Sequence, residues 1–167
     1  KIHCTNPKSI EVIKESYPVV FAFWHEHLFF LLHFFKTRKM PLLMIPRDKR
    51  DWLVGVAEHF HLRLAKGSVE GGGRHAILTI LDELKAGRAV AVPASGPMSP
   101  EHRCKTSCLI VAQEAKDPIL PVSWKAKFQY TVSKNSSRVF IPLPFNIIEI
   151  RVGEPLTIDR HAEYKEL

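Results

Sequence analysis

Short apolar runs alternate with segments of helical periodicity along most of the chain. Residues 19–24 (VVFAFW) are apolar and rich in β-branched and aromatic side chains, which is typical of a buried strand, and residues 28–35 (LFFLLHFF) suit a helix. The other expected elements are a helical lead-in at residues 1–17, strands at 40–46, 61–65, 88–93 and 118–124, and helices at 51–60, 75–87 and 109–115. Strands that alternate with helices favour an α/β fold, a mostly parallel sheet flanked by helices on both faces.

The pattern changes in the last part of the chain. Residues 138–142 (RVFIP) and 147–152 (IIEIRV) both indicate strands with no helix between them, so we expect them to form a C-terminal strand pair. The polar tail from Asp159 is expected to form a short helix. No repeat or linker divides the sequence, so residues 1–167 are expected to form a single domain. Because the first residue is Lys1 and not Met, a missing N-terminal segment is left open.

The charge balance favours anionic partners. Lys and Arg number 24 against 17 for Asp and Glu, which gives a net charge of +7. The basic residues are scattered and the aromatic residues lie in apolar runs, which argues against a nucleic-acid-binding domain. The cysteines number 3, too few for a disulfide framework, so a reduced intracellular chain is expected. Cys104 and Cys108, with His102 nearby, could be a metal site, but no second ligand pair occurs at zinc-finger spacing, so no metal site is expected.

The apolar stretch 19–35 also bears on membranes. His25, Glu26, His27 and His33 interrupt it, so it is too short and too polar for a membrane span. Residues 28–35 are nevertheless very apolar, and basic residues follow them at once. Two interpretations remain open: this segment lies against a bilayer surface, or it is a buried core helix.

Polar residues with useful chemistry follow several expected strands, where open α/β sheets place their sites. His25 comes directly after the first buried strand and is a candidate general base, or else it caps the helix or is a hydrogen-bonded, semi-buried histidine. A carboxylate beside an imidazole fixes its tautomer, and Asp51 is the candidate for that role, or simply the N-cap of the next helix.

Two further loops are candidates for binding anions. The loop of residues 66–74 brings Lys66, Gly67, Ser68 and Arg74 ahead of a helix, where backbone N–H groups and cations suit a phosphate; a solvated loop is the alternative. The loop that follows the strand 88–93 contains Ser95, Gly96 and Pro97 and offers backbone donors for an oxyanion, or is merely a turn.

Taken together, these segments resemble the lysophospholipid acyltransferase-like superfamily, which includes the glycerol-3-phosphate acyltransferases, and in particular its small bacterial branch, long labelled a domain of unknown function. The resemblance runs from about residue 19 to about residue 157. FAFWHEHLFF is similar to a strand that ends in Trp-His, and the run RLAKGS to a later Arg-Gly-Ser, with Lys66 in place of the Arg. VEGGGRHAILTILDELKAGRAVAVP resembles the glycine pair, helix and strand of that branch. DPILPVSW and FIPLPFNIIEIRVGEPLTI resemble its last strands.

The resemblance implies an O-acyltransferase that moves a fatty acyl group from acyl-CoA or acyl carrier protein to a hydroxyl of a lysophospholipid or related lipid precursor. His25 would deprotonate the acceptor without an acyl-enzyme step, and Lys66 and Arg74 would hold its anionic group. The superfamily pairs the base with an Asp in His-x4-Asp, but Phe30 stands at that position, so Asp51 is taken as the substitute. No metal or resident cofactor is implied. The expected location is the cytoplasmic face of the inner membrane, either peripheral or anchored by a segment outside this chain.

The segment SGPMSP departs from the family's Asp-Gly-Pro-Arg-Gly-Pro. Ser95 stands in place of an acidic residue, Met98 in place of an arginine and Ser99 in place of a glycine, and Ser107 also stands where glycine is usual. These departures leave open a second function, a non-catalytic lipid-binding domain that kept the fold.

Overall fold

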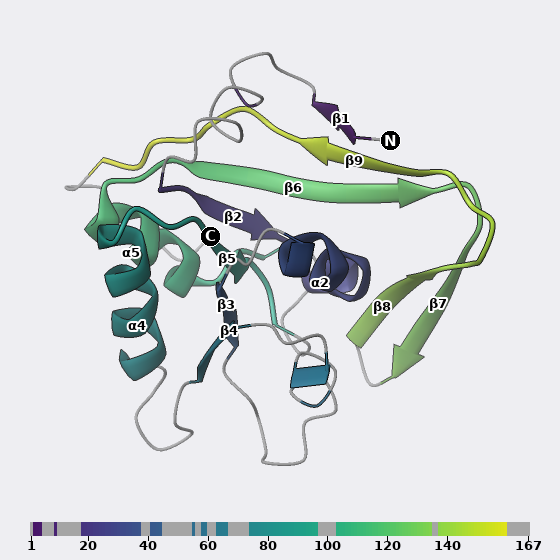
Figure 1. Cartoon of the computed structure of the whole chain (residues 1–167), viewed down its shortest axis with the longest axis horizontal. Helices are drawn as coiled ribbons and strands as arrows, with labels where there is room; N and C mark the ends of the chain where they lie inside the picture. Colours follow the sequence, from purple (N-terminus) through teal and green to yellow (C-terminus); the bar gives the residue numbers. More distant parts are fainter. Residues whose placement is uncertain are drawn as a thin grey trace.

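The computed structural model describes residues 2–4, 9, 18–37, 41–44, 55, 58–59, 63–66, 74–96, 103–134 and 137–159. Its main feature is a seven-stranded sheet (Figure 1). In spatial order the strands are β1 (Ile2–Cys4), β9 (Ile148–Val152), β6 (Ile119–Ala126), β2 (Val20–Phe23), β5 (Val90–Pro93), β3 (Pro41–Met44) and β4 (Arg63–Lys66). Neighbouring strands are parallel except β6 and β9, which are antiparallel, so the expected mostly parallel sheet is confirmed.

Helices cover both faces of this sheet, as the sequence predicted. Helix α2 (Leu28–Thr37) packs on one face, and α4 (Arg74–Lys85) and α5 (Thr106–Ala115) pack on the other. Strand β2 shows why a strand that is covered by helices on both faces needs a continuous apolar run. Phe21 and Phe23 belong to the core on the α2 side, whereas Val20 and Ala22 belong to the core on the α4 and α5 side. Alternate side chains of a strand point to opposite faces, so a strand buried on both faces has no polar position.

Helix α2 is a buried core helix, which decides between the two interpretations of this segment. Leu31 and Leu32 are fully buried, and Leu28 and Phe34 nearly so, all of them in the core cluster that also contains Phe21. Within the described residues, no helix has the length and apolar character needed to cross a bilayer.

The expected pairing of strands 138–142 and 147–152 is wrong. Strand β8 (Ser137–Pro142) pairs with β7 (Gln129–Lys134), and β9 pairs with β6 and β1. Strand β6 continues through residues 127–128 into β7, and β8 leads through residues 143–147 into β9. The four strands therefore form one long antiparallel hairpin with a bend, whose outer part covers α2 (Figure 1). Prolines at 142 and 144 lack the N–H group that a continuous ladder would need, which explains the break before β9.

Other expected boundaries differ by a few residues or fall outside the described part of the chain. Residues Ile2–Cys4 form β1 against β9, not the first turn of a helical lead-in. Helix α5 begins at Thr106, three residues before its expected start at Leu109. The expected tail helix and most of the expected helix 51–60 lie outside the described residues.

Replacement of Leu32 by Ala tests the buried position of α2. The substitution removes a fully buried side chain, so we expect it to lower the free energy of unfolding by about 2–5 kcal/mol, measured by urea denaturation. The control is Leu78→Ala on α4, where half of the side chain is exposed and the change should stay within about 0.5 kcal/mol. Equal effects of the two substitutions would contradict the core assignment.

Candidate functional site

The carboxyl end of β2 is joined to the carboxyl end of β5. The two strands are parallel neighbours with Phe23 opposite Pro93, and the backbone N–H of Ala94 donates to the carbonyl of Phe23 at 2.8 Å. Just beyond this contact, the backbone N–H of His25 donates to Oγ of Ser95 at 3.0 Å. Both residues are buried. The structure therefore brings together the first and the last of the loops that the sequence singled out.

His25 begins a short 3-10 turn, η1 (His25–His27), that leads directly into α2. Its side chain is only 6% exposed. Because His25 is buried, a substrate has to enter the protein to reach its imidazole. A general base at this position would act inside a desolvated site rather than on an open surface.

A cleft of about 420 Å³ opens beside this strand junction, on the face of the sheet that α5 covers in part. That volume lies within the range of roughly 300–1,000 Å³ that is usual for small-molecule sites. Its walls come from the ends of β2 and β5, the start of α5, and the strands β6 and β9. The lining residues are Ala22, Phe23, Trp24, Ala94, Cys104, Cys108, Leu109, Ile119, Pro121, Val122, Ser123, Arg151, Gly153 and Leu156.

The lining of the cleft is mostly apolar and includes the polar side chains of Ser123 and Arg151. Arg151 is the cation among the lining residues, and its Nε donates to Glu149 Oε1 at 3.0 Å. Such a lining suits a mostly apolar ligand. His25 itself is not among the lining residues, although Trp24 and Ala94, next to the His25–Ser95 hydrogen bond, are.

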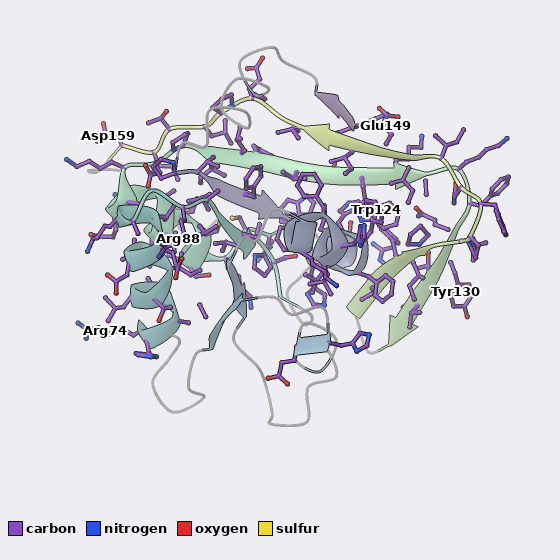
Figure 2. All side chains as sticks on the ribbon, in the orientation of Figure 1. Arg74, Arg88, Trp124, Tyr130, Glu149 and Asp159 are labelled. Atoms are coloured by element: carbon purple, nitrogen blue, oxygen red, sulfur yellow. The ribbon has the colours of Figure 1, made fainter. Side chains whose placement is uncertain are left out.

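The expected anion-binding loop is not brought to the cleft by the described residues. Arg74 is exposed at the first residue of α4 and does not line the cleft (Figure 2). Lys66 ends β4 at the edge of the sheet, with β3 and β5 between it and β2. The other expected site residues, Asp51, Gly67, Ser68 and Pro97, lie outside the described part of the chain, and Gly96 is described as partly buried next to Ser95.

His27, the second histidine of the turn, is used in packing. Its ring meets the rings of Trp124 and Phe140 edge to face, with centroid distances of 5.8 and 5.4 Å, and the Trp124 indole Nε1 donates to the His27 carbonyl at 2.8 Å. These contacts fix η1 against β6 and β8. The turn that presents His25 is therefore held by an aromatic cluster on its far side.

From the sequence, Cys104 and Cys108 are considered only as a metal site and rejected, although Cys104 lies just before α5 and Cys108 lies in its first turn. Cys104 is exposed and Cys108 is buried, and both line the cleft. A hydrogen bond from the Cys108 thiol lowers the pKa of Cys104 to about 7, while the same bond and then burial raise the pKa of Cys108. Because Cys104 precedes the N-cap Lys105, helical spacing alone would not have predicted that the two thiols meet. Among the described residues, no cluster of three or more metal-ligating side chains accompanies them.

Comparisons with known proteins leave the family open. No family model matches the sequence. The chain is 26% identical over 141 residues to an uncharacterised protein of Rickettsia prowazekii, an alignment that covers 84% of this chain and 64% of that protein. The chain thus spans less than two thirds of the length of this curated relative.

The thiol pair predicts a pH-dependent reactivity of Cys104. Its alkylation by iodoacetamide should rise through a midpoint near pH 7, because the thiolate is the nucleophile and its pKa is about 7. Replacement of Cys108 by Ala removes the hydrogen-bond donor and should move the midpoint upward, toward the ordinary value of 9.0. Peptide mapping by mass spectrometry separates the cysteines. An unchanged midpoint in the variant would contradict the thiol–thiol contact.

Ser95→Ala tests the link between the two strand ends. It leaves the buried N–H of His25 without this hydroxyl, so the free energy of unfolding should fall by about 1–3 kcal/mol. Ser123→Ala, on the cleft wall, is the matched control. A neutral Ser95→Ala in thermal denaturation would show that the hydrogen bond contributes nothing to stability.

Proposed function

We propose that this chain is an O-acyltransferase that moves a fatty acyl group from acyl-CoA or acyl carrier protein to a hydroxyl of a lysophospholipid or related lipid precursor. The observation that carries the proposal is the position of His25. Its backbone N–H donates to Oγ of Ser95, next to residues that line an apolar cleft. A candidate base and a compartment for an acyl chain thus share the carboxyl end of one strand, where α/β sheets hold their ligands. The resemblance described above points to the same chemistry.

In this mechanism the imidazole of His25 takes the proton of the acceptor hydroxyl as the oxygen attacks the thioester carbonyl. The new C–O bond forms, the C–S bond breaks, and the imidazolium returns its proton to the leaving thiolate. Backbone N–H groups near Gly96 stabilise the oxyanion. Asp51 orients the imidazole. No metal or resident cofactor takes part.

The cation that lines the cleft is Arg151 and not Arg74, which the sequence had suggested. Arg151 lines the cleft and is the group that meets an anionic part of a substrate, whereas Arg74 is exposed at the start of α4. Lys66, Gly67 and Ser68 keep only the sequence-based proposal of holding the acceptor's phosphate, since β3 and β5 separate Lys66 from β2. The reaction takes place at the cytoplasmic face of the inner membrane, where both the acyl donor and the lipid acceptor occur.

A second function is favoured by one specific observation. His25 is 6% exposed and is not among the lining residues of the cleft. A domain that only binds a lipid needs the cleft and has no need for an accessible base. Together with the altered segment SGPMSP, this burial supports a non-catalytic lipid-binding domain as the alternative.

The deciding experiment measures thiol release from acyl-CoA in the presence of lysophospholipid acceptors. Replacement of His25 by Gln should lower the rate by roughly a hundredfold or more, because general-base catalysis contributes at least that much. His33→Gln, at an exposed position on α2, is the matched control and should keep full activity.

Two results would count against the acyltransferase proposal. Unchanged thiol release by His25→Gln would remove His25 from the mechanism. If the unaltered chain releases no thiol from any donor and yet binds a fluorescent fatty acid, the lipid-binding function is the correct one.

A further inference from the structure

Exposed apolar side chains are concentrated on one part of the molecule. Of the eight large apolar residues that are exposed among the described residues, six lie on β7 and on the bend around it. They are Phe128, Tyr130, Val132, Leu143, Phe145 and Ile147. We call β7, β8 and the bend residues 127–128 and 143–147 the ribbon. It projects from the ends of β6 and β9, with Tyr130 on its outer strand (Figure 2). Contiguous exposed apolar surface of this kind marks an interaction site.

The register of the ribbon shows how its two faces differ. Phe140 of β8 packs against the rings of His27 and Trp124, so the face that carries Phe140 is turned toward the core. Tyr130 is paired with Ile141, the next residue along β8, and therefore lies on the opposite face. The polar β7 residues Gln129, Thr131 and Ser133 fall on the Phe140 face instead. On the face opposite Phe140, Tyr130 and Val132 of β7 are exposed, whereas Val139 of β8, which is paired with Val132, is buried. The outer strand thus turns apolar side chains outward, the reverse of what a water-exposed strand needs.

The bend presents its apolar residues in a fixed conformation. The side-chain Oδ1 of Asn146 accepts hydrogen bonds from the backbone N–H groups of Lys127 and Phe128, at 3.1 and 3.3 Å, and its Nδ2 donates to the Phe128 carbonyl. Phe145, the residue before it, has a φ of 54° and is fully exposed. A bulky residue with positive φ is uncommon. The chain here holds an aromatic ring out into solvent at a conformational cost.

The charged residues of the segment that contains the ribbon are basic, and Lys125 at its base stands opposite Glu149 in the β6–β9 pair. Between Asp117 and Glu149 the sequence contains no acidic residue, and its basic residues there are Lys125, Lys127, Lys134 and Arg138. The side chains of Lys125 and Lys127 are exposed, and the Lys127 ammonium lies 5.3 Å from the centre of the Phe128 ring. Basic groups beside exposed aromatic and aliphatic groups are complementary to a bilayer surface that contains anionic lipids.

We infer that the ribbon is a membrane anchor that inserts the apolar side chains of its outer face into the interface of an anionic bilayer. Phe128, Tyr130 and Phe145 supply amphipathic or apolar rings for the headgroup region, and the lysines contact lipid phosphates. A second copy of this chain fits less well. A symmetric contact would place the patch against itself, and the basic groups of the two copies would then repel each other.

The anchor also has a defined relation to the candidate site. Phe140 of the ribbon contacts His27, which is two residues from His25 in the same turn. Docking through the outer face would therefore hold the carboxyl end of β2 close to the lipid surface. The inference does not depend on acyl transfer, because vesicle binding is measured without any substrate turnover.

The test is sedimentation of the full chain with vesicles of phosphatidylcholine alone and with vesicles in which roughly a third of the lipid is phosphatidylglycerol. We expect strong binding to the anionic vesicles, weakened by salt. Phe145→Ser should weaken it by roughly tenfold, as expected for removal of a ring from an apolar environment. Leu78→Ser, an exposed position on α4, is the matched control and should bind like the unaltered chain.

A second variant separates charge from apolar insertion. The double substitution Lys125→Gln and Lys127→Gln should lower binding to anionic vesicles by roughly tenfold and leave binding to neutral vesicles unchanged. Thermal denaturation of each variant checks that it is folded. Equal binding of Phe145→Ser and the unaltered chain would overturn the inference. Loss of a dimer in gel filtration of Phe145→Ser, with no vesicle binding by either protein, would overturn it in favour of self-association.

Discussion

The candidate site depends on the hydrogen bonds that hold β2 from both sides. This strand pairs in parallel with β6 and β5, and its two faces are buried under separate helices. Water does not reach such a strand, so each of its backbone polar groups must find a partner in the protein. The pairing continues one residue beyond the strand, from Ala94 to Phe23, and then the Ser95 hydroxyl takes over as acceptor for the His25 N–H. The position of the His25 backbone is thus set by its contact with the end of β5.

The two faces of the sheet differ in how completely they are covered, and this difference makes the cleft. On one face α2 packs over β2 and β6, and β8 with its aromatic cluster closes the side. On the other face α5 begins at Thr106 and lies beside β2, and no other described helix covers β6 and β9 near Pro121 and Arg151. An apolar ligand bound there would complete the layer that the helices leave unfinished. The same geometry serves catalysis and simple lipid binding, and this is why both remain as proposals.

Local sequence was sufficient where a segment had one possible environment. Residues 19–24 have no polar position and so had to be a buried strand, and the apolar periodicity of α4 fixed that helix. Residues 28–35 are apolar on nearly every side, so core and bilayer surface looked alike until the packing against Phe21 was known. Strand β7 was missed because QYTVSK alternates weakly and turns its apolar residues outward.

The site residues likewise divide into those that local sequence predicts and those that depend on tertiary packing. The sequence showed that His25 follows a strand, because the apolar run stops just before it. Its partner Ser95 depends on the register of β2 against β5, which no local pattern specifies. Arg151 and Cys104 line one cleft only because β9 and the start of α5 meet across the sheet. The positions of these two residues in the sequence do not predict that contact.

The parallel contact between β1 and β9 has a consequence for how the chain folds. It joins Ile2 to Ile150, so nearly the whole of this sequence must be synthesised before β1 finds its neighbour. Closing so long a loop is entropically unfavourable and slow compared with forming a local hairpin such as β7–β8. On the ribosome, the hairpin can form before the chain is complete, whereas β1, which emerges before the other described strands, is among the last of them to be fixed in place. The order of emergence and the order of assembly are therefore opposed at this edge of the sheet.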